Sequence, residues 1–233
     1  MQKTISIHQP NYFPWLGYFY KIYQSDIFVF LDDVQFNAEG MQNYHYIKTA
    51  QDQLRLKIPV NARFGTTIED VHIKNELPWK KKHLKTVEMN YKKAPFFEEV
   101  FSDYQSLLFQ DNDQLSGLDI SIIQFICGKL NIETKFVNSS ALNVKSQKED
   151  KIIDICKHLN ANIYYSGTGA KAYQEESRFA NESIELRYSS FKPFEYTQQW
   201  DAFDPNVSIF DYLMNCGYDW SQVLQNQPKG EKK

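Results

Sequence analysis

Residues 26–32 read Asp-Ile-Phe-Val-Phe-Leu-Asp, an unbroken apolar run with an acidic residue at each end. A run without polar alternation is typical of a β-strand buried on both faces, as in a parallel sheet. Upstream, Thr4 to His8 alternates apolar residues and is followed by Pro10, which predicts a first strand. Between these two strands, residues 15–23 have apolar side chains at helical spacing. Strand, helix and strand in close succession predict a β-α-β unit and a parallel sheet.

The remaining chain continues this pattern. Apolar spacing predicts helices over 79–91, 96–109, 115–130, 146–159 and 207–216, and strands over 135–137, 163–166 and 184–188. Ser146 and Glu149 have capping-box spacing, and Gly217 follows the last predicted helix. Residues 34–74 contain short alternating segments, which indicate an antiparallel insertion. We therefore predict one α/β domain over residues 1–233, with a mainly parallel, Rossmann-like sheet flanked by helices, a small antiparallel insertion and a loose tail at 228–233.

Composition excludes several classes of protein. The chain of 233 residues is 42% hydrophobic and 24% charged, as in ordinary globular domains. Its net charge of -3 argues against a nucleic-acid partner. The three cysteines form neither a disulfide framework nor a zinc motif. The N-terminus does not resemble a signal peptide, and no apolar run approaches the roughly 18 residues that span a bilayer. We expect a cytoplasmic protein without membrane insertion.

Polar residues follow three of the predicted strands. They are the segments His8 to Tyr12, Asp32 to Gln35 and Ser166 to Gly169. In an open α/β sheet, ligands bind outside the carboxyl ends of the strands, where the strand order reverses. If the three strands are neighbours, their loops converge on one crevice.

The residue types in these loops indicate their chemistry. His8 is a candidate general base, because imidazole changes charge near neutral pH. Asp32 or Asp33 would hold an ammonium group, sugar hydroxyls or a divalent cation. The stretch from Gly167 to Gly169 offers backbone N–H groups that suit a phosphate or an oxyanion.

The segment 8–19, His-Gln-Pro-Asn-Tyr-Phe-Pro-Trp-Leu-Gly-Tyr-Phe, carries a specific resemblance. Together with Lys21, residues 32–36 and residues 165–173, it resembles the WbqC-like family of bacterial proteins. Members of that family occur in gene clusters for O-antigen and other surface polysaccharides. This chain departs from the family pattern at Tyr44, where members tend to have arginine, so a basic phosphate ligand is not expected at that position.

The resemblance implies an acyl or glycine transferase that modifies an amino sugar or a sugar nucleotide in O-antigen (lipopolysaccharide) biosynthesis. His8 would be the general base and Gln9 an oxyanion donor. Asp32 or Asp33 would orient the sugar, with Asp33 counted among the catalytic residues. The expected substrate-binding residues are Asn11, Tyr12, Trp15, Asp32, Gln35, Asn43, Lys48, Ser166, Gly167, Thr168, Gly169 and Tyr173. We expect no metal and no bound cofactor. The acyl donor would be a thioester of coenzyme A or of a carrier protein, or an adenylate.

Two alternatives remain open. A strand followed by a His-bearing turn and a helix is also the arrangement of nucleotide-binding enzymes that adenylylate substrates, with Asp32 and Asp33 holding Mg²⁺. The other alternative is a non-catalytic binding protein of the same pathway.

Overall fold

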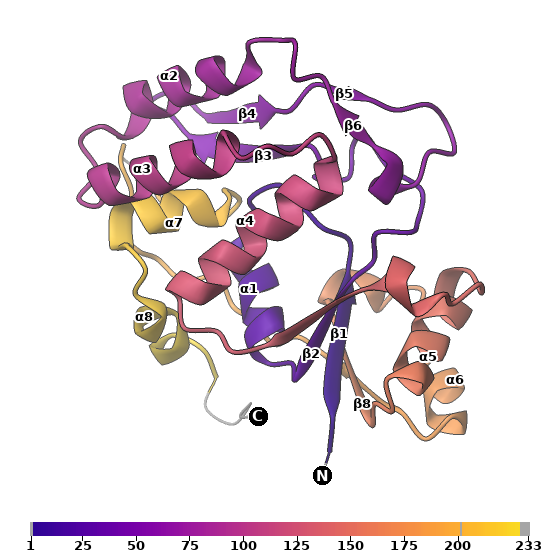
Figure 1. The fold of residues 1–233 in the computed structure, drawn as a ribbon. Helices are drawn as coiled ribbons and strands as arrows, with labels where there is room; N and C mark the ends of the chain where they lie inside the picture. Colours follow the sequence, from indigo (N-terminus) through magenta and orange to yellow (C-terminus); the bar gives the residue numbers. More distant parts are fainter. Residues whose placement is uncertain (1, 201, 229–233) are drawn as a thin grey trace.

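The structure, a computed structural model, describes residues 2–200 and 202–228, and its centre is a parallel sheet of five strands. These are β1 (Thr4–His8), β2 (Ile27–Phe30), β7 (Lys135–Asn138), β8 (Ile163–Ser166) and β9 (Glu185–Tyr188). Their spatial order is β7-β2-β1-β8-β9, and every pairing is parallel (Figure 1). The α/β class and the Rossmann-like sheet predicted from the sequence are confirmed. Of the tail predicted to be loose, residues 229–233 lie outside the described residues.

The apolar run that predicted β2 is buried on both faces of the sheet. Phe28 and Phe30 point into one hydrophobic core, whereas Val29 points into the other with Ile5 and Ile7 of β1. Side chains alternate between the faces of a strand, so a strand with apolar residues at every position needs cover on both sides. Each buried aromatic or branched side chain stabilises the fold by about 1.5–3 kcal/mol.

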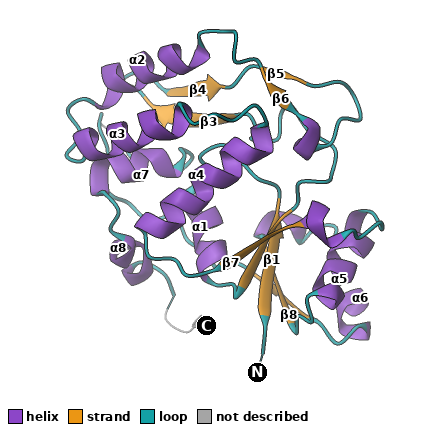
Figure 2. Ribbon diagram, in the orientation of Figure 1, coloured by secondary structure: helices purple, strands orange, loops and turns teal. Residues whose placement is uncertain are grey.

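Helices supply the cover on both faces (Figure 2). One face packs against α1 (Leu16–Tyr23) and α4 (Leu115–Lys129). The opposite face packs against α5 (Lys148–His158) and α6 (Glu176–Asn181). The sheet is thus the middle of three layers. No helix in the described part of the chain is both long enough and apolar enough to cross a membrane.

The connection from β2 to β7 is larger than the predicted antiparallel insertion. It contains an antiparallel hairpin of β3 (Tyr44–Lys48) and β4 (Gln53–Lys57). A second antiparallel pair follows, β5 (Val60–Asn61) and β6 (His72–Ile73), and the short helix η1 (Ile68–Asp70) lies between its two strands in the chain. The connection also contains α2 (Trp79–Tyr91) and α3 (Phe97–Leu108), besides α4. Near the C-terminus, α7 (Ile209–Cys216) returns to pack on this region, and α8 (Trp220–Gln225) follows. The predicted antiparallel segments are present, with helices packed against them.

The predicted capping box at the start of α5 is not formed. The N-cap residue is Gln147, without a side-chain cap, and the Ser146 hydroxyl is buried without a partner. Glu149 instead pairs with Arg178 of α6 at 2.5 Å and accepts the Glu175 backbone N–H at 3.0 Å. A charge-assisted bond is about twice as strong as a neutral one, so the contact with α6 replaces the cap.

Asp119 of α4 provides a test of the core. Both its carboxyl oxygens are buried without a hydrogen-bond partner, and burial raises its pKa well above the usual value. At pH values above the usual pKa of aspartate, Asp119 is ionised in the unfolded chain but still protonated in the folded protein. The free energy of unfolding therefore falls as the pH rises. We predict that Asp119→Asn raises the free energy of unfolding by about 1–3 kcal/mol, more at pH 8 than at pH 5, in urea titrations.

The matched control is Asp32, which is equally buried but accepts hydrogen bonds from Asn138 and Ser140. Asp32→Asn should destabilise the protein by about 1–3 kcal/mol, because an amide nitrogen would face donors. A loss of stability in Asp119→Asn at pH 8 would show that the carboxylate has a favourable partner.

Candidate functional site

The strand order places a switch point between β1 and β8. From β1 the chain proceeds to β2 and β7 on one side, whereas β8 and β9 lie on the other side. The loops that leave β1 and β8 therefore diverge and open a crevice at the carboxyl ends of these strands. A cavity of about 350 Å³ occupies this place, and we call it the switch-point cavity. It is lined by Ile7, His8, Gln9, Lys21, Leu31, Ile152, Tyr164, Ser166, Gly167, Gly169, Ala170, Tyr173 and Gln174.

His8 ends β1 with its imidazole at this cavity. Its Nδ1–H donates to the Gln9 carbonyl at 3.1 Å, and the Tyr18 hydroxyl donates to the same oxygen at 3.0 Å. With Nδ1 as the donor, Nε2 has a free lone pair. Burial lowers the pKa of His8 to about 3, and the nearby charge of Lys21 is the second cause of this shift. The ring is therefore neutral at pH 7 and acts as a hydrogen-bond acceptor.

The Gln9 side chain is held from behind by Gln42. The Gln42 amide donates to Gln9 Oε1 at 2.7 Å, which leaves the Gln9 Nε2 group as a donor. Gln42 is fully buried, and the backbone of Gly40 lies against it. A Cβ at Gly40 would lie 2.6 Å from the Gln42 amide oxygen, so a larger residue there would displace the Gln42 side chain. Gln42 thus orients a cavity residue and does not line the cavity itself.

Lys21 of α1 is the cation of the switch-point cavity. The residue is only 4% exposed, and its Nζ donates to the Ile7 carbonyl at 3.0 Å. Burial lowers its pKa to about 7, because charge is costly in a poorly hydrated environment. Lys21 is thus the group at this cavity whose charge changes near neutral pH.

The end of β8 forms the opposite wall. The Ser166 hydroxyl donates to Gln174 Oε1 at 3.0 Å and is buried. After Gly167 the chain makes the short turn η3 (Thr168–Ala170), in which the Gly169 N–H has no acceptor among the described residues. Free N–H groups at the start of a helical turn suit an anionic oxygen.

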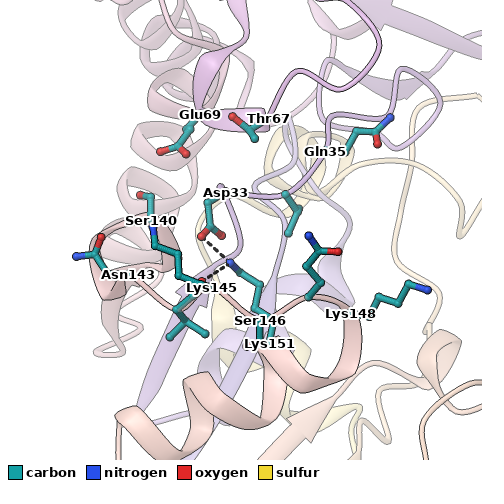
Figure 3. A pocket seen from close by; sticks show the side chains of 13 residues that line it. Asp33, Gln35, Thr67, Glu69, Ser140, Asn143, Lys145, Ser146, Lys148 and Lys151 are labelled. Atoms are coloured by element: carbon teal, nitrogen blue, oxygen red, sulfur yellow. Dashed lines mark hydrogen bonds and ion pairs between the residues drawn. The ribbon is translucent and has the colours of Figure 1, made fainter.

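A second, larger cavity of about 680 Å³ lies at the ends of β2 and β7, and we call it the flanking cavity (Figure 3). It is lined by Asp33, Val34, Gln35, Thr67, Glu69, Ser140, Asn143, Val144, Lys145, Ser146, Gln147, Lys148 and Lys151. Lys151 and Ile152 are adjacent in α5 and border different cavities. The three polar loops therefore do not share one crevice: Asp33 and Gln35 border the flanking cavity, whereas His8 and Ser166 border the switch-point cavity.

The adjacent aspartates have different surroundings. Asp33 pairs with Lys151 Nζ at 2.7 Å and faces the flanking cavity (Figure 3). Asp32 borders neither cavity and is 2% exposed, with its carboxylate bonded to the β7 strand end and to η2 (Ser139–Leu142). Across the flanking cavity, burial and then repulsion by Asp32, Asp70 and Asp33 raise the pKa of Glu69.

Seven predicted substrate-binding residues border neither cavity, namely Asn11, Tyr12, Trp15, Asp32, Asn43, Lys48 and Thr168. Tyr12 is buried with its hydroxyl beside Tyr104. The Asn43 amide donates to the Ile58 carbonyl, and Lys48 Nζ donates to Gln198 Oε1 at 3.0 Å. The indole of Trp15 lies over Gly17, where a Cβ would come within 2.2 Å of the ring. These contacts hold the fold together.

All three thiols are shielded from ionisation by burial. Burial raises the pKa of Cys156 and of Cys216 to about 12 and also raises that of Cys127. The thiols therefore remain protonated at pH 7 and are poor nucleophiles. Within residues 2–200 and 202–228, no three His, Cys, Asp or Glu side chains are grouped as metal ligands would be.

The chain has a Rossmann-like α/β fold with a polar cavity at its switch point. The chain belongs to the WbqC-like protein family, which matches residues 9–223. It is 32% identical over 228 residues to the uncharacterized protein Rv1507c of Mycobacterium tuberculosis, a match that covers 96% of this chain and 98% of that protein. No solved structure matches the chain.

Sequence reasoning did not single out Lys21, Lys151 or Gln174 as site residues. Lys21 lies on a predicted helix whose other face is apolar, and a lysine there is usually solvated. The one sequence feature that could have identified Lys21 is its place among the residues that resemble the WbqC-like family. Lys151 and Gln174 enter the cavities only because α5 and the turn after η3 fold over the sheet.

The Asp33–Lys151 pair yields a prediction that separates a structural role from a catalytic one. Both side chains are largely buried, so Asp33→Asn or Lys151→Met alone should cost about 3–5 kcal/mol in urea unfolding. Each single change leaves a buried group without its partner, so the double variant should lose clearly less than the sum of both. If the losses in the free energy of unfolding are additive, or if Asp33→Asn is as stable as the unmodified protein, the pair does not stabilise the fold.

Proposed function

We propose that the protein is an acyl or aminoacyl transferase that acts on an amino sugar or a sugar nucleotide in bacterial surface-polysaccharide biosynthesis. The observation that carries this proposal is the convergence on one cavity of an unprotonated imidazole, His8, and of donors from Gln9 and Gly169. Acyl transfer to an amine requires a proton acceptor and donors for an oxyanion. The resemblance to proteins from polysaccharide gene clusters supports the choice of acceptor.

In the proposed reaction, the amine nitrogen of the sugar attacks the carbonyl carbon of an acyl thioester. His8 Nε2 takes a proton from that nitrogen as the carbon–nitrogen bond forms. The Gln9 amide and the Gly169 N–H donate to the developing oxyanion. The carbon–sulfur bond then breaks, and the thiolate receives the proton from His8. The products are an amide and a free thiol.

The thioester donor would be a derivative of coenzyme A or of a carrier protein, used as a co-substrate. A direct transfer is favoured over a cysteine-linked intermediate, because burial raises the pKa of all three thiols. The flanking cavity would receive the sugar. Asp33 would accept hydrogen bonds from its hydroxyls, and the Gln35 amide would donate or accept.

A nucleotide-binding, adenylylating enzyme is the second candidate, favoured by the strand order and its switch point. Its proposed magnesium site at Asp32 and Asp33 has less support. Asp32 borders neither cavity, and Asp33 pairs with Lys151. A thermal-shift titration with ATP, with and without Mg²⁺, tests this candidate directly.

The decisive test of the transferase is mass spectrometry of sugar nucleotides incubated with glycyl or acyl thioesters, with and without the protein. The expected product is an amino sugar nucleotide whose mass increases by one acyl group. If no acceptor gains an acyl group across both donor classes, the proposal is wrong.

For an active donor–acceptor pair, we predict that His8→Ala lowers kcat by about 10²–10⁴, the usual contribution of a positioned base. The melting temperature should change little, because the imidazole donates a single hydrogen bond, to the adjacent Gln9 carbonyl. His72→Ala is the matched control, since His72 is exposed on β6 and borders neither cavity. An unchanged kcat in His8→Ala would remove His8 from the mechanism.

A further inference from the structure

Lys21 is a buried cation without an acidic partner. Among the described residues, no ion pair joins it to a carboxylate, and its Nζ bonds to a backbone carbonyl. A buried charge is costly unless an opposite charge compensates it. The contrast with Lys151 is direct, because that lysine is equally buried but pairs with Asp33.

The other polar groups of the switch-point cavity also favour an anion. No aspartate or glutamate lines it in the described chain. The Gln9 amide and the Gly169 N–H are available as donors. The titratable side chains that line the cavity with Lys21 are His8 of β1, Tyr164 of β8 and Tyr173 after η3. Burial lowers the pKa of His8 and raises that of Tyr164, so both are uncharged at neutral pH. Lys21 is the lysine or arginine among the described lining residues, and its protonated form carries the positive charge of the cavity.

We infer that the switch-point cavity binds an anionic oxygen group, a carboxylate or a phosphate, which forms an ion pair with Lys21 Nζ. The assignment of this anion to a substrate of acyl transfer rests on the proposed function, whereas its binding does not. The anion would then lie in the cavity that His8 also lines.

The ion pair has a consequence for His8. In the empty cavity the charge of Lys21 helps to lower the pKa of His8, second to burial. A bound anion would offset that charge and raise the pKa values of both Lys21 and His8. His8 would then become a stronger base when the anionic ligand is present. Binding should also be accompanied by proton uptake, since free Lys21 is only partly protonated near pH 7.

The experiment is calorimetric titration of the full chain with sodium sulfate or sodium acetate at low ionic strength. Neither anion titrates between pH 6 and pH 9, so any pH dependence belongs to the protein. We expect the affinity to fall about tenfold per pH unit above pH 7, with uptake approaching one proton at pH 8. The two salts distinguish the sources, because a phosphate site prefers sulfate and a carboxylate site prefers acetate.

Lys21→Met should abolish this binding and is expected to fold, because it removes an uncompensated buried charge and retains the apolar stem. Lys145→Met is the matched control, since Lys145 borders the flanking cavity. Loss of binding in Lys145→Met alone, or binding by the unmodified protein without proton uptake, would overturn the inference. If Lys21→Met fails to fold, the proton uptake of the unmodified protein decides.

The result is separable from the test of the proposed function. Anion binding that depends on Lys21, without acyl transfer to any acceptor, would leave the anion site standing and reject the transferase. Acyl transfer with no proton-linked anion binding would reject the site and leave the transferase standing.

Discussion

The structure depends on the burial of β1 and β2 on both faces. Because Val29 points away from Phe28 and Phe30, helices must pack on both sides of the sheet, and each parallel pairing needs a long crossover. Those crossovers place β2 and β7 on one side of β1, and β8 and β9 on the other. The switch-point cavity is therefore a consequence of the same apolar run that specifies the strands.

The fold follows from local pattern to a large extent. The parallel strands and most helices have regular apolar spacing, and the order of these elements implies a parallel sheet. Apolar spacing predicted α2, α3 and α4 in the β2–β7 connection, and the structure contains them. Their packing against the antiparallel strands and α7 could not be predicted, because those partners are distant in sequence. The capping box at Ser146 failed for a similar reason. Its Glu149 is taken by Arg178, which only the tertiary fold brings near.

The site was predictable where the strand ends decide it. His8, Gln9, Ser166 and Gly167 border one cavity because they end two adjacent strands. Sequence reasoning could not separate Asp33 from that cavity. The separation depends on α5, which crosses the sheet and carries Lys151 to one cavity and Ile152 to the other. The sequence also could not show which lysine has an acidic partner, because Lys151 and Asp33 are distant in sequence.

The two cavities differ in how charge is balanced. In the flanking cavity Asp33 and Lys151 form an ion pair, and the lining also contains Glu69, Lys145 and Lys148 (Figure 3). Charges of both signs are thus available there to hydroxyl groups, which donate and accept hydrogen bonds. In the switch-point cavity Lys21 Nζ donates to the Ile7 carbonyl and lies over the Phe28 ring, and no carboxylate pairs with it among the described residues. A ligand with hydroxyl groups at one end and an anionic group at the other would match both cavities, with the anion at Lys21 in the switch-point cavity.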